Sequence, residues 1–233
     1  MKIKLFADGA NIQDIKSLYS SGDVRGFTTN PTLMKKAGVD NYLDFALQVL
    51  EVVNDLPVSF EVFSDDFDEM YKQAKTLASL GNNIYVKIPV TNTKGETSAP
   101  LIKKLDKEGI KINVTAVFTT EQVQEILSNM SGNNPHIISV FAGRIADTGL
   151  DPVNIMKDCL AKIKNHSPLL ELLWASPREV LNIYQAEEVG CDIITATPDI
   201  LKKMSLRGKC LEEFSRETVT MFYEDAQTSG YRL

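Results

Sequence analysis

The sequence predicts a closed (β/α)8 barrel, the TIM-barrel architecture, in a single α/β domain. Short apolar runs rich in β-branched residues alternate with longer segments of helical periodicity from end to end, and eight such runs can be counted. Alternation of this kind implies parallel strands joined by right-handed crossovers. A doubly wound open sheet is the alternative, because a count of eight depends on where the boundaries are drawn. No linker, repeat or low-complexity stretch divides residues 1–233, so we expect one domain.

The individual elements follow from the apolar runs and the segments between them. The expected strands are 3–8, 26–30, 58–63, 84–90, 111–118, 136–143, 171–176 and 192–197. The intervening helices are predicted at 12–20, 42–54, 65–80, 99–107, 121–129, 152–164 and 177–189, and one at 198–204 follows the last strand. Gly81, Gly109 and Gly190 precede strands four, five and eight, where glycine commonly ends a helix. A final helix within 209–228 lies beyond the predicted barrel.

The composition excludes several functional classes. The 233 residues carry a formal charge of −6 and are 43% hydrophobic, which is ordinary for a folded domain and argues against disorder. The sequence pI of 5.1 argues against nucleic acid as a partner. Three widely spaced cysteines and two histidines predict no disulfide scaffold and no metal site. No apolar stretch long enough to cross a bilayer and no leader-like segment is found, so we expect a cytoplasmic protein with no membrane partner.

Polar residues gather on one face of the predicted strands. Alternation along each strand places seven of them inside the barrel, mostly near the carboxyl ends where (β/α)8 enzymes build active sites. They are Asp8, Glu61, Lys87, Asn113, Thr115, Ser139 and Ser176. The same reasoning places Trp174 inside, with Leu173 and Ala175 outside. Each of the seven polar residues has an ordinary structural explanation, such as Glu61 pairing with Lys87 or Asp8 capping a helix. Seven such residues in one register nevertheless predict a site.

This set of side chains suits Schiff-base chemistry. Burial disfavours the ammonium form of a lysine, and a neutral amine can attack a ketone to form an imine that accepts electrons when the adjacent C–C bond breaks. Asp8 and Glu61 supply two carboxylates for the proton transfers, and amide and hydroxyl groups would bind sugar hydroxyls. Arg144 and Arg178 follow strands six and seven, and Ser176-Pro-Arg178 opens a helix, a setting that favours a phosphate-type anion. No cofactor or metal is required.

Six stretches, in order along the chain, resemble the transaldolase family, in particular its short members, which include fructose-6-phosphate aldolase-type enzymes. They are Asp8-Gly-Ala-Asn11, Gly26-Phe-Thr-Thr-Asn-Pro-Thr-Leu33, Tyr85-Val-Lys-Ile-Pro89, Ile112-Asn-Val-Thr115, Phe141-Ala-Gly-Arg-Ile145 and Ala175-Ser-Pro-Arg178. The resemblance implies a Schiff-base lysine at Lys87, Asp8 as the acid and base of C–C cleavage, and a catalytic water positioned by Glu61 and Thr115. It also implies contacts with the substrate from Thr29, Asn30, Asn113, Ser139 and Phe141, and with its phosphate from Arg144, Ser176 and Arg178.

The implied reaction moves a dihydroxyacetone unit from a ketose phosphate to an aldose phosphate in the pentose phosphate pathway. The donor would be fructose 6-phosphate or sedoheptulose 7-phosphate. The resemblance to aldolase-type members implies Gln and Tyr at the two positions where this chain has Glu61 and Phe141. These two residues therefore favour transfer over the release of free dihydroxyacetone. Release, a sulfonated ketose as substrate, and a barrel that only binds sugar phosphates are the alternatives. Departures such as Gly9 and ISVFAGRI leave the exact sugar and anion open.

The last helix carries large apolar side chains, among them Phe214, Val219, Met221, Phe222 and Tyr223. It would pack either on its own barrel or on a neighbouring subunit. The resemblance to short members of the family implies a ring-like assembly, in which this helix docks on a neighbouring subunit. We therefore expect a homo-oligomer, a pentamer or decamer rather than a dimer.

Overall fold

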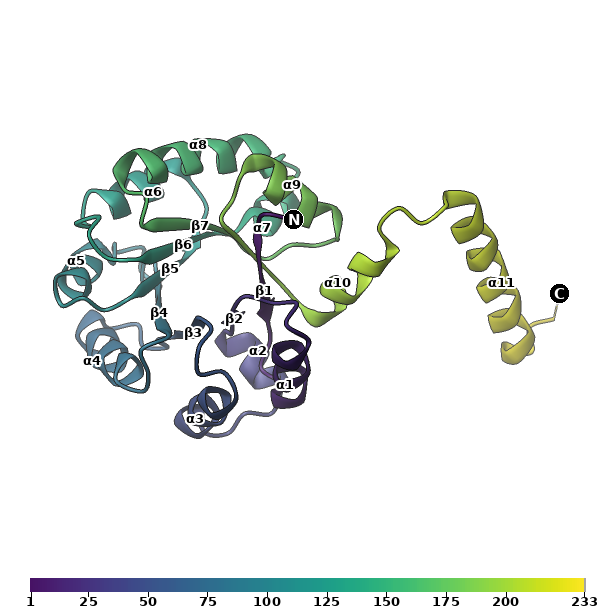
Figure 1. The fold of residues 1–233 in the computed structure, drawn as a ribbon, viewed down its shortest axis with the longest axis horizontal. Helices are drawn as coiled ribbons and strands as arrows, with labels where there is room; N and C mark the ends of the chain where they lie inside the picture. The colour runs from purple at the N-terminus through teal and green to yellow at the C-terminus, as the bar shows by residue number, and fades with distance from the viewer. Residues whose placement is uncertain (233) are drawn as a thin grey trace. The chain divides into compact units, whose positions relative to one another are not determined.

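A closed barrel of eight parallel strands forms the first part of the chain (Figure 1). The computed structural model describes residues 1–232, and contacts divide the chain into two compact units, the first of which is Met1–Leu201. The strands pair in sequence order and β1 closes on β8, so the predicted (β/α)8 barrel is confirmed and the open sheet is excluded. They are β1 (Lys4–Asp8), β2 (Phe27–Thr28), β3 (Val58–Glu61), β4 (Ile84–Pro89), β5 (Ile112–Val117), β6 (His136–Val140), β7 (Leu170–Trp174) and β8 (Ile193–Ala196).

Helices follow the strands as the periodicity predicts, but the helix expected at 177–189 begins only at Leu181, so Ser176-Pro-Arg178 does not open it. The helices are α1 (Ile12–Ser21), α3 (Tyr42–Val52), α4 (Phe67–Ala78), α5 (Ala99–Lys107), α6 (Thr120–Leu127), α8 (Pro152–His166), α9 (Leu181–Val189) and α10 (Pro198–Lys202). Two short helices were not predicted, α2 (Pro31–Lys36) and α7 (Ala142–Asp147). Six residues are too few to display a helical period, and the expected strands 26–30 and 136–143 extended towards or into these segments.

An apolar cluster fills the interior of the barrel. It contains Phe6, Ile137, Leu173, Ala175 and Ile193. Since Leu173 and Ala175 face inward, the neighbouring Trp174 faces the helices, where it is fully buried. The expected orientation of this strand was therefore wrong. Both faces of β7 are mostly apolar, so alternation gave no signal for the side that lies inside.

A buried hydrogen-bond network lies at the amino end of the barrel. His136 Nδ1 accepts the Ile112 backbone N–H at 3.1 Å, which leaves Nε2 as the donor to Asp106 Oδ1 at 2.8 Å. Asp106 also accepts hydrogen bonds from the Ser131 N–H and from Asn134 Nδ2. Burial raises the pKa of Asp106, but these hydrogen bonds outweigh it and lower the pKa to about 2. Burial also lowers the pKa of His136, in keeping with a neutral ring. The network joins α5 to β5 and β6.

The loop after β7 packs tightly against α7. The Gly143 N–H donates to the carbonyl oxygen of Ala175 at 3.3 Å. A Cβ atom on Gly143 would lie only 1.5 Å from the backbone oxygen of Ser176. Ser176 itself has a left-handed backbone, with φ +60°. Only glycine at 143 therefore allows this loop to approach the helix so closely.

The second unit begins at Lys202 and consists of a 3-10 turn, η1 (Lys203–Leu206), and the long helix α11 (Leu211–Ser229). None of the residues of α11 is buried. Large apolar side chains are thus left open to solvent, and Leu211 is 81% and Phe222 62% exposed. Within residues 1–232 we find no helix with both the length and the apolar character that crossing a membrane requires.

We predict that Asp106→Asn destabilises the barrel. All three partners of this carboxylate are donors, and the new amide group would turn a donor towards them. The free energy of unfolding at pH 7 should fall by about 2 kcal/mol or more, the size that a carboxyl pKa lowered from 3.8 to about 2 implies. The contribution is present above pH 3.8 and is lost as the pH falls towards 2, so wild type and variant should converge in acid. Urea unfolding across this range tests it, with exposed Asp68→Asn as the control. A difference in unfolding free energy between wild type and variant that stays constant across this pH range would contradict the prediction.

We also predict that Gly143→Ala disturbs the loop after β7. The added methyl group overlaps the Ser176 carbonyl, and relieving such overpacking typically costs about 1–3 kcal/mol or more. Thermal unfolding should show a clearly lower midpoint. Gly9→Ala is the matched control, because a Cβ there meets no atom within 4 Å and the backbone needs no left-handed φ. Equal midpoints for the two variants would refute the proposed close approach.

Candidate active site

A cavity of about 530 Å³ opens at the carboxyl ends of the barrel strands. Residues from all eight strands or from the segments that follow them supply its polar lining. Of the residues expected from the sequence, it is lined by Asp8, Asn30, Glu61, Lys87, Thr115, Ser139, Phe141, Arg144, Ser176 and Arg178. Of the seven residues expected inside the barrel, all but Asn113 line this one cavity, and Ser176 does so from the loop after β7, whose predicted orientation was wrong.

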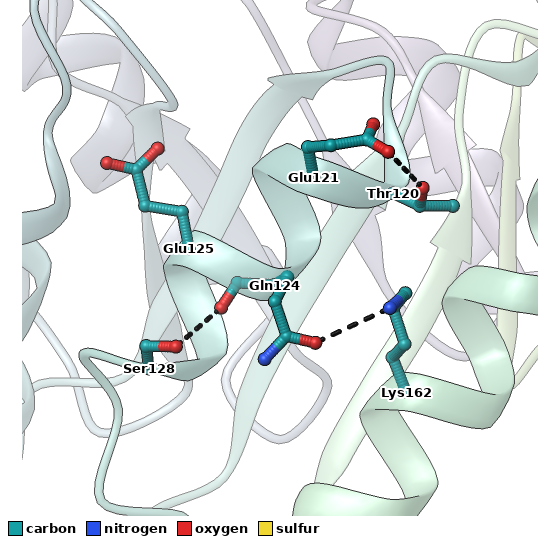
Figure 2. Close-up of a pocket in the computed structure, with 6 residues that line it drawn as sticks. All are labelled: Thr120, Glu121, Gln124, Glu125, Ser128 and Lys162. Carbon is teal, nitrogen blue, oxygen red and sulfur yellow. Dashed lines mark hydrogen bonds between the residues drawn. The ribbon is translucent and has the colours of Figure 1, made fainter.

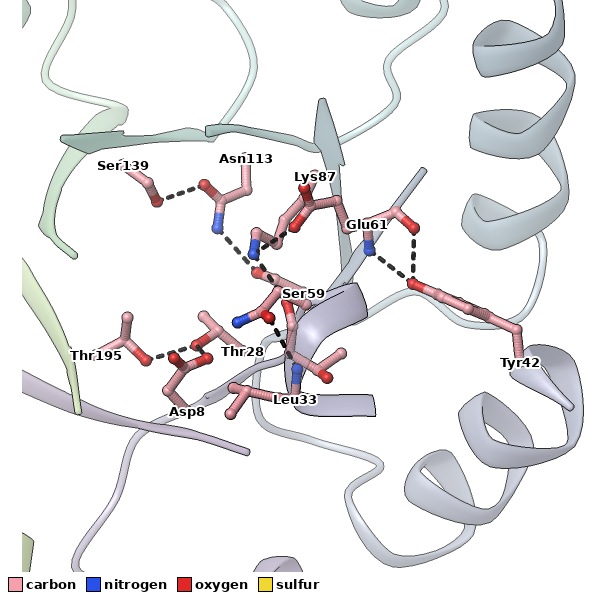
Figure 3. A network of polar contacts seen from close by, with 12 residues as sticks. Asp8, Thr28, Leu33, Tyr42, Ser59, Glu61, Lys87, Asn113, Ser139 and Thr195 are labelled. Atoms are coloured by element: carbon pink, nitrogen blue, oxygen red, sulfur yellow. Dashed lines mark hydrogen bonds and ion pairs between the residues drawn. The ribbon is translucent and has the colours of Figure 1, made fainter. Parts of the chain in front are cut away.

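Lys87, on β4, lines this cavity and belongs to the polar network in Figure 3. Its Nζ is 2.8 Å from Glu61 Oε2 and donates a hydrogen bond to the Thr29 carbonyl oxygen, also at 2.8 Å. Glu61 and Lys87 face each other because they are direct partners in the β3–β4 register. The lysine is only 5% exposed, so these two acceptors replace most of its water.

Asp8 ends β1 on another side of the cavity. Its Oδ1 accepts a hydrogen bond from Thr28 Oγ1 at 2.8 Å, and Thr28 Oγ1 lies 2.6 Å from Thr195 Oγ1. Burial raises the pKa of Asp8, while the positive charge of Lys87 and the Thr28 hydrogen bond oppose the rise. A carboxyl group whose pKa is raised is better suited to both accepting and donating a proton.

A second polar network lies beside the lysine. Asn113 donates from Nδ2 to Ser59 Oγ at 3.1 Å and accepts the Ser139 hydroxyl at 2.6 Å. Asn113 is fully buried and does not line the cavity, so it supports Ser139 from below rather than facing the open space. Thr115 Oγ1 is different: it is buried, lies at the cavity wall and has no hydrogen-bond partner in the described chain. Such a hydroxyl can bind a ligand oxygen or a water.

The structure places Thr29 differently from the sequence expectation. Its side chain is buried away from the cavity, and its backbone carbonyl holds Lys87 instead. Thr28 lines the cavity in its place. β2 contains only two residues, so alternation could not decide between the two threonines. Sequence reasoning also missed other lining residues, among them Lys36, Ala175, Thr195 and Thr197. Lys36 lies on a helix that the sequence did not reveal.

Cationic side chains surround the mouth of the cavity. Lys36, Arg144 and Arg178 all line it. The guanidinium of Arg144 lies 5.4 Å from the centroid of the Phe141 ring. Arg178 donates from Nε and Nη2 to the carboxylate of Asp147, which occupies one edge of its guanidinium. The mouth thus combines positive charge with the Ser176 loop, an arrangement that can bind an anionic head group.

A hollow on the outer surface shows the contrast with this cavity. Figure 2 shows polar side chains of α6 and α8 around a space of about 370 Å³. Lys162 Nζ donates to Gln124 Oε1 at 3.4 Å, and the Ser128 hydroxyl donates to the Gln124 backbone oxygen. None of the side chains that line this hollow is buried. We find no chemistry for it.

Known proteins resemble this chain over nearly its full length. A family model described as transaldolase/fructose-6-phosphate aldolase matches residues 5–232. A protein described as a probable transaldolase from Thermoanaerobacter sp. (strain X514) is 34% identical over 231 residues, 99% of this chain and all of the relative. One from Thermoplasma volcanium is 35% identical over 225 residues, covering 96% of this chain and 95% of its own.

Among solved structures, a dihydrodipicolinate synthase family protein from Coccidioides immitis superposes with a TM-score of 0.60 at 11% identity, covering 84% of this chain and 66% of that one. This likeness concerns the fold alone. The family model and the relatives go further, because they span the barrel and the segments that line its cavity. The chain belongs to the transaldolase/fructose-6-phosphate aldolase family and is a transaldolase-type enzyme.

Proposed function

We propose that this enzyme transfers a dihydroxyacetone unit between sugar phosphates through a Schiff base on Lys87. One observation carries the proposal: Lys87 and Asp8 line the same cavity, and Lys87 Nζ is 2.8 Å from Glu61 Oε2. An amine, a base beside it and a second carboxyl are the groups that imine formation and C–C cleavage require. The relatives described as probable transaldolases support the same reaction class.

In the first step Glu61 accepts a proton from Lys87, and the neutral amine attacks the ketone carbon of the donor sugar. The carbinolamine then loses water, for which Glu61 supplies the proton, and an iminium forms. The unpartnered hydroxyl of Thr115 is placed to hold this water as it leaves and when it returns.

In the second step Asp8 removes the proton of the hydroxyl group on the carbon that departs. The C–C bond breaks, its electron pair moves into the iminium, and an aldose phosphate leaves. The enamine that stays on Lys87 attacks the aldehyde of an acceptor, and Asp8 returns the proton to the new hydroxyl group. The raised pKa of Asp8 suits it to both directions of this transfer.

Selectivity for the substrate would come from the two ends of the cavity. Ser139, positioned by Asn113, and Asn30 would bind sugar hydroxyls near the lysine. Arg144, Ser176 and Arg178 would bind the phosphate, and a sulfonate would satisfy the same donors. Phe141 has no hydroxyl group to assist release of the bound unit, which favours transfer to an acceptor over the release of free dihydroxyacetone. Fructose 6-phosphate and sedoheptulose 7-phosphate are the donors to try first.

We further propose that the enzyme works as a homo-oligomer, pentamer or decamer, through α11. This helix buries none of its residues within the chain, and its apolar side chains, including Phe214, Met221 and Phe222, recur at helical spacing. Apolar area of this extent is uncommon on a monomer. A second copy of the chain would cover it.

Trapping of the Schiff base tests the reaction. Incubation with fructose 6-phosphate and borohydride should leave a reduced three-carbon unit on the peptide that contains Lys87, detected by mass spectrometry. Lys87→Met should abolish both adduct and turnover, and Lys104→Met, at an exposed lysine of α5, should change neither. An adduct on another lysine, or full turnover by Lys87→Met, would rule out the proposal. Free dihydroxyacetone formed at turnover rates without an acceptor would indicate an aldolase instead.

Sedimentation equilibrium tests the assembly. We expect the wild type to have a multiple of the 25.9 kDa chain mass and Phe222→Glu to dissociate towards that mass, because a charge cannot be buried in an apolar interface without a partner. Thr220→Glu is the control, since this exposed residue lies on the side of α11 away from Phe222. A monomeric wild type would disprove the proposal.

A further inference from the structure

The barrel wall has a gap in its backbone hydrogen bonding beside Glu61. β2 contributes only two residues and pairs with β3 only at Phe27–Val58 and Thr28–Ser59. The last hydrogen bond between these segments runs from the Thr29 N–H to the Ser59 oxygen. The chain then turns into α2, which Asn30 caps through the Leu33 N–H. Along β3, Val58 and Val62 donate towards β4, so Glu61 presents its N–H and C=O to the side that β2 has left.

The hydroxyl of Tyr42 fills this gap. Tyr42 Oη donates to the Glu61 carbonyl oxygen at 2.7 Å and accepts the Glu61 N–H at 2.8 Å. Figure 3 shows both bonds, with the Glu61 carboxylate turned the other way, towards Lys87. A single side-chain oxygen from the first residue of α3 thus supplies the two hydrogen bonds that a longer β2 would have made. Buried backbone groups need such partners.

We infer that Tyr42 is a positioning residue for the proposed Schiff-base reaction: by fixing both backbone groups of Glu61, its hydroxyl holds the Glu61 carboxylate against the Lys87 amine. The inference rests on the proposed function and adds to it a residue outside the cavity lining. Tyr42 acts only through Glu61 and touches no reacting atom.

The hydroxyl of Tyr42 makes the hydrogen bonds to Glu61, and its ring makes separate packing contacts. The ring packs against Phe60 and Phe63, with centroids 6.4 Å and 5.4 Å away, and this packing would remain without the oxygen. Burial raises the pKa of Tyr42 well above its ordinary value, so the hydroxyl keeps its proton and stays a donor to the Glu61 carbonyl oxygen. Tyr42→Phe therefore removes the two hydrogen bonds and little else.

The first measurement compares Tyr42→Phe with the wild type in single-turnover trapping on Lys87. We expect imine formation and kcat to fall about 10- to 100-fold, the range in which a misplaced proton-transfer group acts, with KM changed less than twofold. Tyr19→Phe is the matched control: its hydroxyl donates to Asp55 at the surface, and neither residue lines the cavity. Amide hydrogen exchange in the peptide around Glu61 should show faster exchange in Tyr42→Phe alone.

A double-mutant cycle separates positioning from a general structural effect. In a Glu61→Ala background there is no carboxylate to position, so adding Tyr42→Phe should lower the remaining rate less than threefold. The same large loss in both backgrounds would overturn the inference, and so would a Tyr42→Phe enzyme with the rate of the wild type.

These outcomes stay distinct from failure of the proposed function. A wild type that forms no adduct with any ketose phosphate or sulfonate overturns the proposed function and this inference with it. If the wild type forms the Lys87 adduct but Tyr42→Phe causes the same loss of rate with and without Glu61, only the role of Tyr42 is overturned. The proposed Schiff base on Lys87 is then unaffected.

Discussion

The ion pair between Lys87 and Glu61 is the interaction on which the site depends. An amine that is only 5% exposed has lost most of its water, and removing one partner of a buried pair typically costs about 3–5 kcal/mol. The barrel provides the partner through strand register, since β3 and β4 align these two residues directly, and Thr29, the residue after β2, adds its carbonyl oxygen. Charge that would destabilise an ordinary core is thereby kept where a ligand can reach it.

Much of the fold and of this pair could be predicted because β3, β4 and β5 alternate clearly. Their outward positions are β-branched or aromatic and their inward ones polar, so period two places Glu61, Lys87 and Thr115 on one side. β7 lacks that contrast, and its orientation was wrong at Trp174. β2 is too short to alternate, and Thr29 was expected where Thr28 lies.

Other features of the site depend on three-dimensional neighbours and leave no local pattern. Asn113 and Ser139 both face inward, yet only the structure shows that one supports the other. The pairing of Arg178 with Asp147 joins residues from different loops. Tyr42 looks like an ordinary first-turn residue of α3, and nothing in the sequence indicates that its hydroxyl bonds to Glu61.

The short β2 strand has a consequence for how this barrel can change. In a (β/α)8 barrel the strands close into a cylinder through their own backbone hydrogen bonds, and the helices form an outer ring. Here a side chain of α3 completes one stretch of the cylinder. The helix α3 and the strand β3 therefore depend on each other and have to change together. Replacing α3 by the matching helix of a relative without a hydroxyl at this position would reopen the wall, even if every residue of the cavity were kept.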